Sequence, residues 1–266
     1  MQFSAGEYNQ FRRLLEQKSG ILLGENKQYL VSSRLTSFMK DNKIESLSAL
    51  LSRINTPSCT TMMQKIIDLM TTNETLWFRD NYPFQFMKNT VIPEMKKRGH
   101  FRIWCAACSS GQEPYSLSML LDETASADIS EIIATDLSSR ILDRAKSGIF
   151  YDIELKRGMP DDKLERYFSR LDATRWQINK SMRDSIQFQT YNLLKLPYTR
   201  GKFDVIFCRN VLIYFSKENK KRVLDGLTQS LKPGGYLVLG ASESLIQCSS
   251  SLEMHRCNPG LVYRKP

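Results

Sequence analysis

The alternation of short apolar runs with helix-like segments after about residue 100 constrains the fold of this chain most strongly. Strand-like runs occupy 102–106, 131–135, 203–208 and 236–239, and a shorter run follows at 261–263. The segments between them show the apolar spacing of helices. Such an alternation predicts an α/β domain in which helices cover both faces of a mostly parallel sheet.

The first 70 residues, in contrast, show helical spacing only. Apolar residues such as Tyr8 and Phe11 recur at intervals of three or four, and no run of β-branched residues interrupts them. We therefore predict a small helical N-terminal domain at 1–72, a connecting segment at 73–100 and the α/β domain at 101–266.

The segment 149–190 does not fit this simple alternation. It is charged, Gly158 and Pro160 interrupt it, and alternating residues at 176–178 and 185–189 indicate short strands. We predict that this segment is an insertion in the α/β domain and that it forms a small antiparallel β-subdomain.

The overall composition is that of a soluble globular protein. Hydrophobic residues make up 41% of the chain and charged residues 25%. No apolar run approaches the length of about 20 residues that a membrane helix needs. The first residues also lack the basic start and apolar block of a signal peptide. We therefore expect a cytoplasmic protein without membrane insertion.

A C-x-x-C pair, Cys105 and Cys108, invites a zinc or a redox interpretation. No second pair and no nearby histidine supports a metal site, because the only histidines are His100 and His255. We predict that the two cysteines pack inside the protein and that no metal is bound. The scarcity of histidine also weighs against a hydrolase with a Ser-His or Cys-His arrangement.

A turn of small residues at 107–112 follows the first predicted strand, and Asp136 ends the second. Ligands of open α/β sheets bind at the carboxyl ends of the strands, where small residues let the backbone approach closely. An acid such as Asp136 can accept hydrogen bonds from ribose hydroxyls there, although the pattern alone also allows a helix N-cap. The turn has one glycine, Gly111, followed by Glu113. Such an acid would repel a pyrophosphate but suits the cationic methionine part of S-adenosylmethionine.

Three longer blocks of sequence resemble the signature blocks of one family. They are TTNETLWFRD at 71–80, WCAACSSGQEPYSL at 104–117 and FDVIFCRNVLIYF at 203–215. They are similar to blocks of the CheR family, the chemotaxis-receptor glutamate methyltransferases of bacteria. The resemblance covers nearly the whole chain, because four shorter blocks occur in the family's order: ATD at 134–136, NLL at 192–194, CRN at 208–210 and KPGG at 232–235.

This resemblance implies a Rossmann-like methyltransferase domain that uses S-adenosylmethionine and releases S-adenosylhomocysteine. It implies cofactor contacts, some of them from the connecting segment, for nine residues: Asn73, Thr75, Arg79, Glu113, Asp136, Asn192, Leu193, Arg209 and Asn210. It also places Tyr214 near the transferred methyl group. The chain departs from the family pattern at Trp77 and Gln112, neither of which has an assigned chemical role.

The chemistry of glutamate methylation needs no general base. A glutamate has an unperturbed pKa of about 4.3 and is already ionised at neutral pH. Alignment of the two reactants in a dry pocket is therefore the main requirement. We predict that Arg79, Arg209 and Tyr214 orient the substrate carboxylate. The alternatives are that Tyr214 belongs to the core and that Arg79 forms a salt bridge between domains.

The net charge of +10 favours an anionic partner, which leaves nucleic acid, anionic lipid and acidic protein open. In the resembling family, the methylated helices of the receptors meet a basic helix of the N-terminal domain. Arg34 and Lys40 fall in the matching stretch, and plain solvation is the alternative for both. The insertion is a few residues shorter than in members that bind a receptor's C-terminal tail peptide, so we expect no need for such a tail. We expect a monomer.

Two competing functions are less well supported. Amino-directed nucleic-acid methyltransferases carry an [N/D]-P-P-[Y/F] block and C5-directed enzymes a Pro-Cys nucleophile, and this sequence has neither. We therefore expect no nucleic-acid partner. The second is a binding module that senses the cofactor without transferring methyl groups, and the matching residues Asn73, Arg79, Glu113, Asp136 and Asn210 argue against it.

Overall fold

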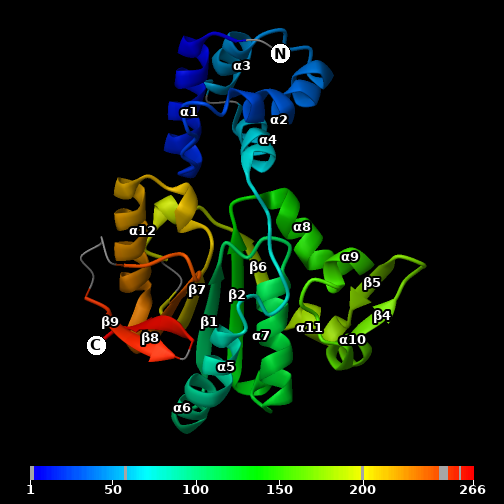
Figure 1. The fold of residues 1–266 in the computed structure, drawn as a ribbon, viewed down its shortest axis with the longest axis vertical. Coiled ribbons are helices and arrows are strands. Elements are labelled where there is room, and N and C mark those ends of the chain that lie inside the picture. The colour runs from blue at the N-terminus through cyan, green and yellow to red at the C-terminus, as the bar shows by residue number, and fades with distance from the viewer. Residues whose placement is uncertain (1–2, 57–58, 199–200, 246–250, 258) are drawn as a thin grey trace.

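The computed structural model describes residues 3–56, 59–198, 201–245, 251–257 and 259–266. A helical N-terminal domain lies at one end of the molecule, and the α/β domain with its insertion lies at the other (Figure 1). Among the described helices, none is long and apolar enough to cross a membrane.

Four helices build the N-terminal domain, as the helical spacing predicts: α1 (Ala5–Ser19), α2 (Gln28–Asp41), α3 (Leu47–Ile54) and α4 (Thr60–Met70). Their buried faces share one hydrophobic core that includes Phe11, Leu35 and Ile66. A capping box begins α1, because Ser4 accepts from the backbone N–H of Glu7 while the Glu7 carboxylate accepts from the backbone N–H of Ser4.

The connecting segment first runs extended from α4 along the α/β domain and then becomes helical (Figure 1). The helical part consists of α5 (Tyr82–Phe86), a π-helical turn η2 (Met87–Val91) and α6 (Ile92–Arg98). Pro83 stands in the first turn of α5, where a missing N–H has no cost, and Pro93 stands where the π-helical turn η2 passes into α6.

The large sheet has seven strands in the order β6-β2-β1-β7-β8-β10-β9. The strands from β6 to β8 are parallel, and β10 and β9 are antiparallel. All five strands predicted for the α/β domain are present, and two more complete the sheet: β1 (Phe101–Ala106), β2 (Ser130–Asp136), β6 (Ile186–Thr190), β7 (Phe203–Cys208), β8 (Leu231–Leu239), β9 (Glu253–Cys257) and β10 (Gly260–Arg264).

Helices cover both faces of this sheet, as the alternation predicts. Along β1, Ile103 and Cys105 enter one hydrophobic core, whereas Trp104 and Ala106 enter a second core on the opposite face. The main covering helices are α7 (Gln112–Glu123), α8 (Ser139–Ser147) and α12 (Lys217–Ser230), and short 3-10 turns occur at η3 (Ala127–Ile129), η4 (Leu193–Lys195) and η5 (Leu212–Tyr214).

The insertion forms a small antiparallel sheet of order β3-β5-β4. Its strands are β3 (Ile149–Tyr151), β4 (Phe168–Arg170) and β5 (Arg175–Ile178), and its helices are α9 (Asp152–Leu155), α10 (Asp161–Tyr167) and α11 (Lys180–Asp184).

One expectation for the insertion is wrong. The run 185–189 is a strand, but it forms β6 at the edge of the large sheet, in parallel with β2, and is not part of the small sheet. Ile186 pairs with Ile132, and both side chains are buried in the core of the large sheet. An alternating run specifies that a strand forms, but not which strand it pairs with.

The strand order reverses beside β1. The chain runs from β1 outward to β2 and β6 and then returns to the other side of β1 as β7. In open α/β sheets a ligand binds at such a point, outside the carboxyl ends of the strands. The turns that follow β1, β2 and β7 therefore meet where a ligand is expected.

Candidate active site

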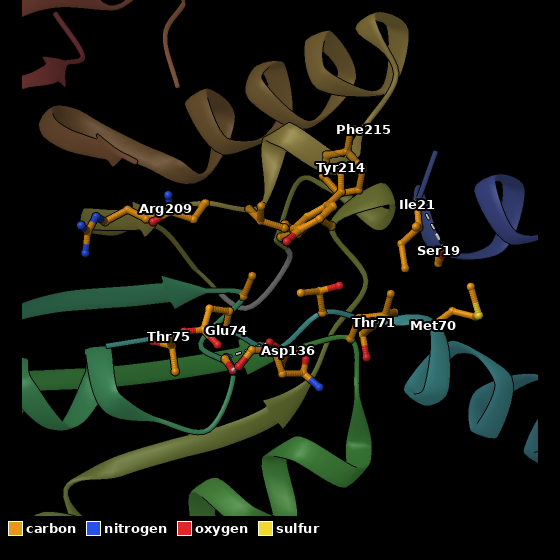
Figure 2. A pocket seen from close by; sticks show the side chains of 18 of the residues that line it. Ser19, Ile21, Met70, Thr71, Glu74, Thr75, Asp136, Arg209, Tyr214 and Phe215 are labelled. Carbon is orange, nitrogen blue, oxygen red and sulfur yellow. Dashed lines mark hydrogen bonds between the residues drawn. The ribbon is translucent and has the colours of Figure 1, made fainter. Parts of the chain in front are cut away.

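A cavity of about 280 Å³ lies between the N-terminal domain and the carboxyl edge of the large sheet. Its walls come from the loop after α1, one face of α2, the extended part of the connecting segment and the turns after β1, β2 and β7. Figure 2 shows Tyr214, which follows β7, on the side of the cavity opposite Asp136.

The structure brings together all ten residues that the sequence assigns to the cofactor or to the transferred methyl group. The cavity is lined by Asn73, Thr75, Arg79, Glu113, Asp136, Asn192, Leu193, Arg209, Asn210 and Tyr214. Of the two residues predicted to meet a partner, Arg34 also lines the cavity, whereas Lys40 lies exposed in the last turn of α2.

Asp136 is the last residue of β2 and is 7% exposed. Its Oδ2 accepts from the backbone N–H of Ser109 at 2.8 Å, and its Oδ1 accepts from the backbone N–H of Ser138 at 2.9 Å. Burial raises the pKa of Asp136, and the backbone N–H groups oppose that shift. Each oxygen keeps a lone pair that can accept a hydrogen bond from a hydroxyl group. The N-cap alternative is wrong, because the cap of α8 is Ser138.

Arg209 is buried and stands at the centre of an ion-pair network that reaches the surface at Asp80. Its Nη1 donates to Glu113 at 3.0 Å, and its Nη2 donates to Asp80 at 2.6 Å and to the carbonyl of Arg79 at 2.8 Å. Burial raises the pKa of Glu113, and the guanidinium of Arg209 opposes that shift. The network fixes the acid after β1 and the connecting segment against the end of β7.

Arg79 differs from Arg209 in having no such partners. Its side chain is half-buried and lines the cavity, and no residue in the described ranges pairs with its guanidinium by a hydrogen bond or an ion pair. A salt bridge between domains, the alternative for Arg79, is therefore not formed within the described ranges. The charge of Arg79 opposes the rise in the pKa of Glu113, so that acid lies within its electrostatic reach, but Arg79 would break no hydrogen bond of the described residues on meeting an anionic ligand.

The N-terminal domain closes the cavity through contacts with the turns of the α/β domain. Leu22 donates its backbone N–H to the carbonyl of Tyr214 at 2.8 Å, and the Asn192 side chain donates to the carbonyl of Lys18 at 2.7 Å. Gly20 ends α1 with φ 81°, and a Cβ there would lie 2.4 Å from the ring of Phe215. A glycine is required at this position by both its conformation and the close approach.

Arg34 joins α2 to the start of the connecting segment. Its Nη1 donates to the carbonyls of Met70 at 2.7 Å and Thr71 at 3.2 Å, and its Nη2 donates to Thr72 at 3.1 Å. These contacts turn the guanidinium toward the domain junction. Lys40, in contrast, offers its charge on the surface.

Tyr214 does not belong to the core, although its neighbour Phe215 does. Phe215 is 7% exposed and lies in a hydrophobic core, whereas Tyr214 is half-buried and lines the cavity.

Two acids near the cavity were not identified from the sequence. Asp80 pairs with Arg209, and Glu243 accepts backbone hydrogen bonds from the loop after β7. Glu243 follows β8, which neighbours β7, so the rule that selects Asp136 at the end of a strand would also have selected Glu243. Asp80 lies within the block TTNETLWFRD, but only the fold shows that a buried arginine lies beside it.

The pair Cys105 and Cys108 consists of buried free thiols, and burial raises the pKa of both well above the ordinary value. Thiols in this state are protonated, which suits packing inside a core. Among the described residues, no group of three or more His, Cys, Asp and Glu side chains has a metal-binding arrangement.

The site fits S-adenosylmethionine by the chemistry of its walls. Asp136 offers acceptors for ribose hydroxyls, and the acid Glu113 suits the cationic amino-acid end. Within the described residues, Nε of Arg209 and Oδ1 of Asn210 are buried without a hydrogen-bond partner, so a donor and an acceptor are available to a ligand. A Rossmann-like sheet with this site at its switch point defines the class of methyltransferases that use S-adenosylmethionine.

Comparisons with known proteins identify the family within this class. Residues 6–71 match the family model "CheR methyltransferase, all-alpha domain", and residues 73–260 match "CheR methyltransferase, SAM binding domain". The chain belongs to the CheR methyltransferase family. The family, the cofactor and the fold class predicted from the sequence are thus confirmed.

Relatives in the family cover nearly the whole chain. Chemotaxis protein methyltransferase Cher2 of Pseudomonas putida is 46% identical over 97% of this chain and 97% of its own. Chemotaxis protein methyltransferase 1 of Pseudomonas aeruginosa is 46% identical over 99% of both chains. Among solved structures, the magnesium protoporphyrin IX methyltransferase of Synechocystis PCC 6803 with bound SAM matches 78% of this chain and 92% of its own, at 13% identity and a TM-score of 0.40.

Proposed function

We propose that this protein methylates glutamate side chains on the cytoplasmic helices of chemotaxis receptors and releases S-adenosylhomocysteine. The names of its relatives, chemotaxis protein methyltransferases, support this substrate. The observation that carries the chemistry is the guanidinium of Arg79, which forms no hydrogen bond or ion pair with the described residues and lines the same cavity as the acids Asp136 and Glu113. One cavity thus offers a positive charge to the substrate carboxylate, from Arg79, and negative charges to the cofactor, from Asp136 and Glu113.

Bound S-adenosylmethionine supplies the methyl group on its sulfonium. We assign Asp136 to the ribose hydroxyls and Glu113 and Asn210 to the amino-acid end. The remaining walls of the cofactor pocket are assigned to Asn73, Thr75, Asn192, Leu193 and Arg209. Arg209 contributes by fixing Glu113 and the carbonyl of Arg79.

The substrate glutamate is ionised at neutral pH, so the protein has to align it and to exclude water. Arg79 is the proposed partner of the substrate carboxylate, and Tyr214, which lines the same cavity, is proposed to orient that carboxylate with its hydroxyl group. No histidine is present among the described residues that line the cavity, which agrees with a reaction that needs no general base.

The proposed partner is a receptor helix rather than nucleic acid. Lys40 can meet an acidic helix from the surface of the N-terminal domain, whereas the contacts of Arg34 suit a role at the domain junction. We further propose that the enzyme acts in the cytoplasm as a monomer, without insertion into the membrane. It does not require a receptor tail peptide, because the hairpin turn between β4 and β5 is short.

Labelled S-adenosylmethionine and receptor cytoplasmic fragments, with and without the C-terminal tail, test this proposal. We expect alkali-labile label on both fragments at similar rates, since glutamate methyl esters hydrolyse in base. Fragments with glutamine at the methylation sites should accept no label. Label that resists alkali, or label on the glutamine fragments, would contradict glutamate as the acceptor. Label only on tailed fragments would contradict the independence from the tail.

A further inference from the structure

Glu243 lies behind the loop that carries two of the proposed site residues. Strands β7 and β8 are parallel neighbours, and Cys208 pairs with Leu239 at their carboxyl ends. The chain after β8 makes a tight turn in which the N–H of Glu243 donates to the carbonyl of Gly240 at 2.9 Å. This turn returns the Glu243 carboxylate to the loop 209–214 that follows β7.

The carboxylate of Glu243 accepts four backbone hydrogen bonds. Its Oε2 accepts from Asn210 at 2.7 Å and from Gly240 at 2.9 Å. Its Oε1 accepts from Leu212 at 2.7 Å and from Ile213 at 3.3 Å. An ionised carboxylate has about four lone-pair sites and no donor, so it suits a set of converging N–H groups. Hydrogen bonds to a charged group are also the stronger kind.

The loop held in this way has an unusual backbone. Asn210 has φ 57°, a left-handed conformation that non-glycine residues rarely adopt. The contacts of Glu243 with Asn210 and Leu212 fix the chain on both sides of Val211. The same loop ends in η5, which places Tyr214 in the cavity wall and presents its carbonyl to Leu22 of the N-terminal domain.

We propose that Glu243 is a positioning residue for methyl transfer, which acts through the loop 209–214 on Asn210 and Tyr214. Glu243 itself is not among the residues that line the cavity. This inference rests on the proposed contacts of Asn210 and Tyr214 with the cofactor and methyl group. It does not depend on which protein supplies the glutamate.

The variant E243Q tests the role with little change in shape. Its amide has one carbonyl oxygen, and its NH2 group would face backbone N–H donors. We expect the dissociation constant for S-adenosylhomocysteine to rise roughly tenfold, the loss of one good charge-assisted hydrogen bond. We also expect the turnover number at saturating S-adenosylmethionine to fall roughly tenfold, because Tyr214 moves with the loop.

The matched control is E7Q in the N-terminal domain. Glu7 accepts from the N–H of Ser4 at 2.7 Å and from the N–H of Ser48 at 3.2 Å, and it does not line the cavity. This variant should lower the melting temperature and leave the dissociation constant for S-adenosylhomocysteine unchanged. A general loss of stability in E243Q would have the same signature as E7Q, and that result would overturn the positioning role.

A double-mutant cycle locates the effect. In an N210A background, E243Q should weaken S-adenosylhomocysteine binding less than in the wild type, because the contact on which Glu243 acts is already lost. Additive effects would contradict action through Asn210. Wild-type protein that does not bind S-adenosylhomocysteine would contradict the proposed cofactor contacts instead, so the two failures are distinct.

A second variant covers the case in which E243Q does not fold. In G240A, the added Cβ would lie 2.8 Å from Oε2 of Glu243, 2.8 Å from Nδ2 of Asn210 and 2.9 Å from the backbone N of Asn210, so the loop or the turn has to shift. We expect G240A to weaken S-adenosylhomocysteine binding in the same way as E243Q. Normal binding by folded G240A would contradict the inference.

Discussion

The two sides of the cavity hold their backbone turns in different ways. On the β2 side, the carboxylate of Asp136 accepts from Ser109 and Ser138 and also lines the cavity. On the β7 side, the carboxylate of Glu243 accepts from the loop 209–214 but lies outside the cavity wall. One acid thus combines binding with support of the fold, whereas on the other side the two tasks belong to different residues. A mutation of Glu243 should therefore disturb the β7 side without removing a group of the cavity wall, whereas a mutation of Asp136 removes the support and the binding group together.

The largest effect is expected for Asp136. Replacement by Asn removes the negative charge that is proposed to accept hydrogen bonds from the ribose hydroxyls. It also weakens the hydrogen bonds from the backbone N–H groups of Ser109 and Ser138. We expect S-adenosylhomocysteine to bind roughly 100-fold more weakly, the loss of two hydrogen bonds to a charged group. Isothermal titration of D136N beside the matched surface variant D128N measures this change. A loss of less than threefold would contradict the assignment of Asp136 to the cofactor, because binding would not depend on this residue.

The next effect is expected for Arg79. In R79A the substrate carboxylate loses its cation, while the network of Arg209, Asp80 and Glu113 is kept, because it uses only the backbone carbonyl of Arg79. We expect the turnover number to fall by about 30-fold, with a smaller change in S-adenosylhomocysteine affinity. Transfer rates at saturating receptor fragment measure it. Equal losses in turnover and in cofactor affinity would indicate that Arg79 contacts the cofactor and not the substrate carboxylate.

A dependence on pH distinguishes Asp136 from exposed acids. Burial raises its folded pKa above the ordinary value of 3.8, so as pH rises the unfolded chain loses this proton before the folded chain does. The group therefore favours folding below pH 3.8, and this contribution is lost as pH rises through the folded pKa. D136N should remove this part of the slope in urea unfolding measured at several acidic pH values. An identical slope for wild type and D136N would contradict the raised pKa.

A smaller effect is expected on the outer surface of the N-terminal domain. K40A removes one exposed charge from the last turn of α2, and Lys40 does not line the cavity. We expect KM for a receptor fragment to rise about twofold at low salt and the difference to vanish at high salt, because salt screens exposed charges. An unchanged KM at low salt would support the alternative that Lys40 is simply solvated.

The layers of the fold were predictable because its buried strands leave a strong trace in the sequence. The runs of β1 and β7 are apolar and buried on both faces of the sheet, and turns of small or polar residues follow them. The place of β6 was not predictable in the same way. Its alternating pattern suits any half-buried sheet edge, and its pairing with β2 depends on how α11 returns the chain.

Some cavity residues could likewise be predicted from their place in the sequence, and others could not. Asp136 ends β2, and Glu113 lies in the first turn of the helix after β1, so the switch-point rule places both near a ligand. Most other positions came from the resemblance of whole blocks to a family. Asp80 was missed because its partner, Arg209, is 129 residues away in the sequence. The difference between Arg79 and Arg209, one without partners and one enclosed by acids, is visible only in the folded chain.

The most direct test of the central claim is isothermal titration of the wild-type protein with S-adenosylmethionine and with S-adenosylhomocysteine. We predict that both bind at one site per chain, that the product binds more tightly, and that D136N binds both ligands roughly 100-fold more weakly. Failure of both ligands to bind the folded wild-type protein would contradict the claim that this cavity is the cofactor site of a working methyltransferase.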